Sequence, residues 1–287
     1  LSGLGIGKHD RIVMVGENSV DQVLLILAAA KIGAVSVTLN YRLAPSEMRT
    51  IIADACCKLV AILDSQCVDR VAEAARGLQL GVDNPRQIHC LAMAEKLPAD
   101  WMDWQQWCSQ QPCREIEAVS DVDDAFLQLY TSGTTGRPKG AIISHRNIVD
   151  LGMSGLIAAE NRPSIADTEL IMAPLFHIGA IAPLLYSLMI GVTVIIHRSF
   201  NPLAVVDAIE TDRLKSLFMV PAMIQAILAA VPDLEQRDFS SLVRINYGAS
   251  PIGENLLLKA LDIFGCYFQQ SYGMTETAGA VCQLTVA

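Results

Sequence analysis

Short runs of apolar residues alternate with amphipathic helical segments along almost the whole chain, and this alternation is the strongest constraint on the fold. It begins with a run at 11–15 and a helical pattern at 21–32, and it ends with a helical pattern at 254–264 and a run at 267–271. Strands that are apolar at successive positions are typical of parallel sheets buried on both faces. We therefore expect an α/β fold with two mostly parallel sheets sandwiched between helices.

The pattern forms two series of strands and helices. Strands are expected at 11–15, 34–39, 59–63, 88–93, 125–130, 141–144, 170–173, 192–196, 216–220, 243–247 and 267–271. Helices are expected at 21–32, 45–55, 68–78, 101–107, 147–159, 203–211, 222–231 and 254–264. A polar loop at 162–168 suggests two subdomains, 1–165 and 166–287.

The stretch from 170 to 196 contains no Asp, Glu, Lys or Arg and is long enough to span a bilayer. Pro174, Gly179, Pro183 and Gly191 divide it into pieces of strand and helix length. We interpret it as a buried strand, turn, short helix and strand rather than as a transmembrane segment.

Charge and cysteine content exclude several classes of protein. The 287 residues carry 21 Lys and Arg against 30 Asp and Glu, a formal net charge of −9, which argues against nucleic-acid and anionic-membrane binding. The eight cysteines form no Cys-x-x-Cys pair, so neither a zinc site nor a disulfide framework is expected. We therefore expect a reducing, cytoplasmic location. The sequence starts at Leu1 without an initiator methionine, and its first residues do not resemble a targeting peptide.

The densest motif follows the apolar run at 125–130. It combines glycines, which let backbone N–H groups turn toward an anion, with hydroxyl donors and a flexible lysine, and this is chemistry for a polyphosphate. The spacing differs from a Walker A loop, because Lys139 is followed by Gly140. The residues concerned are Thr131, Ser132, Gly133, Thr134, Thr135, Gly136 and Lys139.

Three further motifs lie at or beyond the ends of expected strands, where ligands collect in open α/β sheets. In 270–277, Tyr272 offers a flat face for a base and Glu276 a ligand for Mg²⁺, although this motif taken alone is better explained by a Tyr-Gly turn with a solvated glutamate. In 246–251, small residues permit close approach of a planar ligand, and Ser250 is also a candidate helix cap. His177, in 174–179, is either a functional group or a satisfied core histidine.

The four motifs together closely resemble those of the AMP-forming adenylating enzymes, the acyl-CoA synthetases, peptide-synthetase adenylation domains and luciferases. The resemblance lies in the segments 130–140, 174–177, 247–250 and 272–276, which occur in the family's order. The segment 29–40 is similar to a glycine-containing motif that comes earlier in the family's sequences. The resemblance covers almost the whole chain. It implies the layered large domain of these enzymes.

The resemblance also implies a two-step ligase. A carboxylate attacks the α-phosphate of MgATP to give an acyl-adenylate and pyrophosphate, and a thiol, usually of coenzyme A, then takes the acyl group. By this resemblance, the residues around the β- and γ-phosphates are Thr131, Ser132, Gly133, Thr134, Thr135, Gly136 and Lys139. Thr275 would contact the α-phosphate, Glu276 would hold Mg²⁺, and His177 would lie beside the reacting carboxylate. The residues around the adenine would be Gly248, Ala249, Ser250, Tyr272 and Gly273.

The chain departs from the family pattern at its end. The family's ribose-binding aspartate, hinge and small C-terminal domain with its catalytic lysine are expected beyond Ala287, so we expect a fragment of the large domain that does not complete ligation. A charge-free 170–196 argues against an amino acid substrate, since a buried unpaired ammonium is costly. An apolar lining by Ile178, Gly179, Val220, Met223 and Met274 favours a medium- or long-chain fatty acid.

Two alternatives stay open. One is a ligase that loads an acyl carrier protein in place of coenzyme A, which would share every motif. The other is a nucleotide-binding module without catalysis. A serine hydrolase is disfavoured because the chain lacks G-x-S-x-G.

Overall fold

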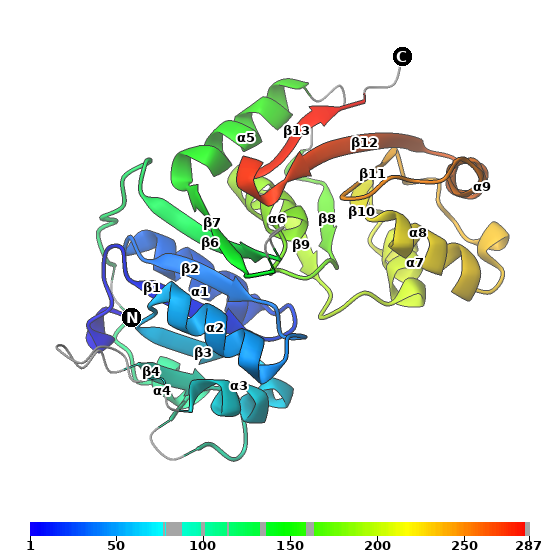
Figure 1. Ribbon diagram of the computed structural model, residues 1–287. Coiled ribbons are helices and arrows are strands. Elements are labelled where there is room, and N and C mark those ends of the chain that lie inside the picture. Colours follow the sequence, from blue (N-terminus) through cyan, green and yellow to red (C-terminus); the bar gives the residue numbers. More distant parts are fainter. Residues whose placement is uncertain are drawn as a thin grey trace. The chain divides into compact units, whose positions relative to one another are not determined.

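The structure is a computed structural model, shown in Figure 1, that describes residues 1–76, 78, 88–98, 101–113, 115–132, 136–158 and 164–284. The chain divides into two compact units, Leu1–Asn147 and Ile148–Ala287. Each unit has its own sheet and its own core and is described by itself. The division expected near residue 165 stays a prediction.

The first unit is built on a seven-stranded sheet in the order β5-β4-β3-β1-β2-β6-β7. All neighbouring strands are parallel except β6 and β7, which form an antiparallel pair. Its elements are β1 (Arg11–Val15), α1 (Val20–Lys31), β2 (Val35–Leu39), α2 (Pro45–Ala55), β3 (Leu59–Ile62), α3 (Val68–Ala75), β4 (His89–Ala92), β5 (Met102–Asp103), α4 (Trp104–Ser109), β6 (Ala125–Thr131) and β7 (Lys139–Ser144), with short 3₁₀ turns at Ser2–Leu4 and Ser65–Cys67.

Burial on both faces explains why the central strands of this sheet are apolar at successive positions. Alternate side chains of β1 and β3, such as Val13 and Val60, pack in one core with α2 and α3, which contribute Ile52 and Val71. Helix α1 begins where Ser19 accepts a hydrogen bond from the backbone N–H of Gln22, and it buries Val23, Ile26 and Ala29. Gly33, in the left-handed region at φ 71°, follows its C-cap as the sequence predicts.

The second unit contains a two-stranded parallel sheet, β8-β9, and a four-stranded sheet in the order β10-β11-β12-β13. Strands β10, β11 and β12 are parallel, and β13 runs antiparallel to β12. Its elements are β8 (Thr168–Ile171), α6 (Ile178–Ile190), β9 (Thr193–Ile196), α7 (Pro202–Thr211), β10 (Ser216–Met219), α8 (Pro221–Ala230), β11 (Arg244–Gly248), α9 (Glu254–Phe264), β12 (Tyr267–Met274) and β13 (Gly279–Gln283), with 3₁₀ turns at Leu234–Gln236 and Thr275–Thr277. Helix α5 (His145–Ala158) begins at the last residues of the first unit.

The two faces of the four-stranded sheet have different chemistry. On β10 and β11, Leu217, Met219, Ile245 and Tyr247 are buried in a core with α7, α8 and α9, to which α9 contributes Phe264. The alternate positions of the same strands point to the opposite face, since successive side chains of a strand alternate, and they are polar except for Phe218 of β10. That opposite face forms a wall of the cavity described below.

The α/β fold class is confirmed, and most expected strands and helices are present within one to three residues of their predicted ends. Four local features differ. Pro183 lies inside α6 without ending it, and β12 continues to Met274 instead of stopping at 271. Neither β13 nor β5, which lies within the helix expected at 101–107, was expected. Among the described residues, no helix is both long enough and apolar enough to cross a membrane. The cytoplasmic location stays a prediction.

Candidate functional site

The ends of the glycine- and threonine-rich loop form an antiparallel ladder in the first unit. Thr131, the last residue of β6, pairs with Lys139, the first residue of β7, and side chains directly opposite in such a ladder lie on the same face. Ser132, Gly136 and Lys139 are exposed, and Gly136 has φ 76°, a conformation that glycine adopts without strain. Gly133, Thr134 and Thr135 lie outside the described residues. The described ends thus bring a hydroxyl and an ammonium group together at one exposed hairpin.

A chain of hydrogen bonds fixes the strand that leads into this loop. Arg11 Nε donates to Gln128 Oε1 at 2.7 Å, Gln128 Nε2 donates to the Tyr130 hydroxyl at 2.9 Å, and that hydroxyl donates to Asp54 Oδ2 at 2.5 Å. Burial raises the pKa of Tyr130, and the hydrogen bond to Asp54 raises it further, so the phenol stays protonated and donates. The network ties β1, α2 and β6 together one residue before Thr131.

A tight turn follows β11 in the second unit. Gly248 ends the strand, and a Cβ at this position would lie 2.4 Å from the carbonyl oxygen of Ser271 on β12. Ala249 takes a left-handed conformation at φ 66° and is exposed, as is Ser250. The alternative role of Ser250 as a helix cap is wrong, because α9 begins at Glu254 with Gly253 as its N-cap.

The segment 272–277 is partly strand and partly 3₁₀ turn. Tyr272 and Gly273 belong to β12, so they lie within the strand rather than beyond it, and Tyr272 is 62% exposed. Thr275 and Glu276 form a 3₁₀ turn in which Thr277 Oγ1 accepts a hydrogen bond from the backbone N–H of Met274. The turn therefore presents the carboxylate of Glu276 to solvent.

His177 occupies the N-cap position of α6, directly after the buried residues Leu175 and Phe176. Its ring is exposed and packs at 4.4 Å, centroid to centroid, against the ring of Phe176. The exposure distinguishes it from a buried core histidine. At this position the imidazole lies beside the first turn of α6.

A cavity of about 620 Å³ lies within the second unit, between α5, α6 and β8 on one side and the polar face of β10, β11 and β12 on the other. Three of the sequence motifs border it: Ala249 from the turn after β11, Gly273 and Met274 from β12, and Ile178 and Gly179 next to His177. Its volume is in the range of small-molecule sites. The structure thus brings residues of three motifs of the second unit to one cavity.

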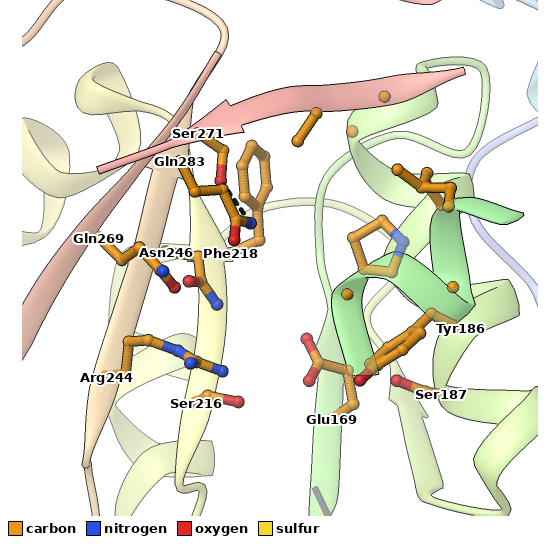
Figure 2. A pocket seen from close by; sticks show the side chains of 18 of the residues that line it. Glu169, Tyr186, Ser187, Ser216, Phe218, Arg244, Asn246, Gln269, Ser271 and Gln283 are labelled. Carbon is orange, nitrogen blue, oxygen red and sulfur yellow. Dashed lines mark hydrogen bonds between the residues drawn. The ribbon is translucent and has the colours of Figure 1, made fainter. Parts of the chain in front are cut away.

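The expected apolar lining is partly wrong. Ile178, Gly179 and Met274 line the cavity, whereas Val220 caps α8 and Met223 packs against the core with α7 and α8. The cavity also has a polar wall, because β10, β11 and β12 turn alternate residues toward it. The polar residues of this wall are Ser216, Arg244, Asn246, Gln269 and Ser271, and Phe218 of β10 is the apolar one (Figure 2). Gln283 of β13 donates from Nε2 to Ser271 Oγ at 3.2 Å.

Two ionisable side chains face each other across this cavity, Glu169 of β8 and Arg244 of β11 (Figure 2). They form no hydrogen bond or ion pair with each other, and the Nε atom of Arg244 is buried without a partner among the described residues. Glu169 is partly exposed and lines the cavity. Burial raises the pKa of Glu169 to about 8, although the positive charge of Arg244 acts in the opposite direction.

Sequence reasoning missed both of these residues. Glu169 lies one position before the charge-free stretch, and Arg244 lies at the start of an expected strand. The available signal was a charged residue at the edge of each strand pattern, next to apolar positions. The absence of an acid between 170 and 196 therefore does not extend to the cavity, because Glu169 lies one position before that stretch and lines the cavity.

The comparison with protein families matches residues 1–287, the whole chain, to the AMP-binding enzyme family. Feruloyl-CoA synthase of an Amycolatopsis species is 34% identical over 293 aligned positions, which cover 99% of this chain and 53% of that protein. The fatty acid–[acyl-carrier-protein] ligase ScoC of Streptomyces coeruleorubidus is 32% identical and is covered to 52%.

Solved structures give the same fold. The inhibitor-bound N-terminal domain of FACL13 from Mycobacterium tuberculosis superposes with a TM-score of 0.84 at 28% identity and covers 99% of this chain and 67% of that one. The anthranilate–CoA ligase AuaEII, solved with anthranoyl-AMP, superposes with a TM-score of 0.87 at 21% identity, which supports the fold alone.

This chain belongs to the AMP-binding enzyme family, as the four motifs predict. Its relatives include acid–CoA ligases and an acyl-carrier-protein ligase. The chain spans about half the length of the curated relatives that it matches.

Proposed function

We propose that this chain is the acid- and nucleotide-binding part of a ligase that activates a carboxylic acid with MgATP and passes the acyl group to a thiol. In the first step a carboxylate oxygen bonds to the α-phosphorus of ATP and pyrophosphate leaves. In the second, a thiol sulfur bonds to the acyl carbon, AMP leaves, and the thiol proton goes to solvent. Coenzyme A is the proposed acceptor, and an acyl carrier protein is the alternative that the ScoC relative supports.

One observation carries the proposal: Ala249, Gly273 with Met274, and the residues after His177 border a single cavity of the second unit. An acid in this cavity would place its carboxylate at the end bordered by these motifs, with His177 beside it. The nucleotide would occupy the exposed turn after β11 and the face of Tyr272, where the close approach at Gly248 leaves no room for a larger side chain.

The phosphate groups of the nucleotide require positive charge and hydrogen-bond donors. Lys139 and the hydroxyls of Thr131 and Ser132 supply them at the hairpin of the first unit. Such donors are effective because charge develops on the phosphoryl oxygens and on the leaving pyrophosphate.

The residues fit one Mg²⁺ ion held mainly by the nucleotide. No group of three or more His, Cys, Asp and Glu side chains gathers at a possible metal site in the part of the chain that the structure describes. The exposed carboxylate of Glu276 provides one ligand, and Mg²⁺ in nucleotide sites takes one or two carboxylates together with phosphate oxygens and water. When bound, the ion would add positive charge beside the reacting phosphate.

The test is thermal unfolding of the 287-residue chain with and without MgATP, compared with Lys139→Ala. At about 100 times the Kd, a bound nucleotide stabilises the folded state by roughly 2.7 kcal/mol. Lys139→Ala should lose most of this stabilisation. Lys259→Ala is the matched control, because Lys259 is an exposed lysine on α9.

The outcomes separate the parts of the proposal. Stabilisation that survives Lys259→Ala and is lost in Lys139→Ala supports a polyphosphate site at the hairpin. The absence of stabilisation by both MgATP and tripolyphosphate would contradict it. Stabilisation without acid-dependent release of pyrophosphate would support the nucleotide-binding module for this chain by itself.

A further inference from the structure

Four side chains of the first unit bond to one another in series beside the hairpin that the proposed function assigns to polyphosphate. The hydrogen bonds run from Arg11 to Gln128 at 2.7 Å, from Gln128 to Tyr130 at 2.9 Å, and from Tyr130 to Asp54 at 2.5 Å. The residues belong to β1, β6 and α2, three elements of the same unit (Figure 1). Of the four, only Tyr130 lies in a sequence motif.

Each group in this four-residue network has one way to bond. The guanidinium of Arg11 can only donate, so the oxygen of the Gln128 amide faces it and the amide nitrogen faces the other way. That nitrogen donates to the hydroxyl of Tyr130, which therefore directs its own proton to the carboxylate of Asp54. A network with a single arrangement holds its side chains, and the strand that carries two of them, in one place.

Gly140 of β7 leaves the space that the Gln128 amide occupies. A Cβ at position 140 would lie 2.3 Å from Gln128 Nε2 and 3.1 Å from Gln128 Cδ. In the antiparallel ladder Gly140 pairs with Tyr130, so the amide lies against both strands of the hairpin. The network thereby holds β6 and β7 at the pair of residues next to Thr131 and Lys139.

The network lies on the face of the hairpin opposite to the phosphate-binding side chains. Thr131 follows Tyr130, Lys139 precedes Gly140, and successive side chains of a strand alternate between faces. An effect of the network on a bound polyphosphate must therefore pass through the backbone of the two strands. Donors that are held in the binding geometry beforehand lose less conformational freedom when a ligand binds.

We propose that the four-residue network positions the polyphosphate site: it sets the backbone of both hairpin strands so that Thr131 and Lys139 converge before the ligand binds. The inference rests on the proposed function, because it takes the hairpin to be the polyphosphate site. Asp54, Gln128 and Arg11 are thus positioning residues that act through the strands. Asp54 is exposed, so its replacement tests the network without removing core packing.

The experiment is isothermal calorimetry of tripolyphosphate binding to the 287-residue chain and to Asp54→Ala. Removal of a negative charge would by itself tighten the binding of an anion. Loss of the network acts in the opposite direction, and Asp54→Ala should bind about tenfold more weakly, the scale of ordering one or two long side chains. Asp54→Asn removes the same charge but keeps an oxygen that accepts from Tyr130, so it should bind at least as tightly as the wild-type chain.

Further variants separate positioning from a general effect on the fold. Asp262→Ala is the matched control, because Asp262 is also an exposed aspartate in the last turn of a helix, and it should change the affinity by less than twofold. Gly140→Ala displaces the Gln128 amide without removing any group of the network, and it should weaken binding by about tenfold. In a Lys139→Ala background, Asp54→Ala should add less than a twofold loss, because the donor that the network positions is absent.

Each outcome has a definite meaning. Weaker binding in Asp54→Ala and Gly140→Ala, with Asp54→Asn unimpaired and no further loss in the Lys139→Ala background, supports the proposal. Unchanged or tighter binding in Asp54→Ala overturns it and leaves the polyphosphate site intact. Equal losses with and without Lys139 also overturn it, because they indicate a general effect on the fold. Failure of the wild-type chain to bind tripolyphosphate overturns the assignment of the hairpin as the polyphosphate site, and the inference with it.

Discussion

Replacing Glu169 by glutamine should change how the stability of the second unit depends on pH. Burial raises the pKa of Glu169 from its ordinary value of 4.5 to about 8 in the folded state. Between these values the folded protein holds a proton that the unfolded chain releases. The free energy of unfolding therefore falls as pH rises from 4.5 to 8, and it is independent of this group outside that window.

The magnitude follows from the two pKa values. A difference between 4.5 and about 8 corresponds to roughly 5 kcal/mol in total, at 1.36 kcal/mol for each pKa unit. Within the window the slope approaches ~1.4 kcal/mol per pH unit. Glutamine has nearly the same shape and does not titrate, so Glu169→Gln should remove this slope and become progressively more stable than the wild-type chain as pH rises.

The assay is urea denaturation of both chains at pH 5.5, 6.5 and 7.5, followed by circular dichroism. The difference between the two chains is the quantity of interest, because contributions from every other titrating group cancel in it. Since the chain has two compact units, the transition that responds to the substitution is analysed by itself. A constant difference across this pH range would refute the reasoning and would mean that Glu169 is hydrated in the folded state.

Two substitutions test the packing of the two units. Gly273→Ala would bring its Cβ to 2.0 Å from the carbonyl oxygen of Gly279, so unfolding measurements should show a loss of about 2–4 kcal/mol. Gly253→Ala meets nothing within 4 Å and should cost only about 1 kcal/mol or less, because Gly253 is the N-cap of α9 and alanine is a poorer cap than glycine. Ile26→Ala on α1 should lower the free energy of unfolding by about 2–5 kcal/mol, because the side chain is fully buried. Leu24→Ala on the same helix should lower it by under about 1 kcal/mol, because Leu24 is 57% exposed. Equal losses for the two variants would contradict the described packing.

The fold could be predicted from the sequence because local patterns and tertiary burial agree. The strand Arg11–Val15 is apolar at successive positions and lies inside a parallel sheet, and Gly33 ends α1 in the conformation that glycine favours. The hairpin of β12 and β13 was missed because Gly279–Gln283 has a weak strand pattern and is held by pairing with β12. Its formation depends on a tertiary contact that no local signal marks.

The candidate site likewise contains residues that local sequence patterns predict and residues that only the tertiary structure brings together. Motifs with dense local chemistry, such as the hairpin between Thr131 and Lys139, were found from residue type and spacing alone. The pair Glu169 and Arg244 could not be found in this way, because its two members lie on β8 and β11 and meet only through the packing of separate sheets around one cavity. Each residue alone is simply a charge at the edge of an apolar run.

The most direct test of the account is calorimetric binding of a non-hydrolysable acyl-adenylate analogue, an acyl-sulfamoyladenosine, to the 287-residue chain. The account predicts that this molecule binds much more tightly than the free acid or AMP, because it fills the cavity and the turn after β11 at the same time. Glu276→Gln should leave its affinity nearly unchanged, since the analogue carries no pyrophosphate for Mg²⁺ to bridge. Binding no tighter than that of AMP alone would contradict the claim that the three motifs of the second unit and the cavity form one site.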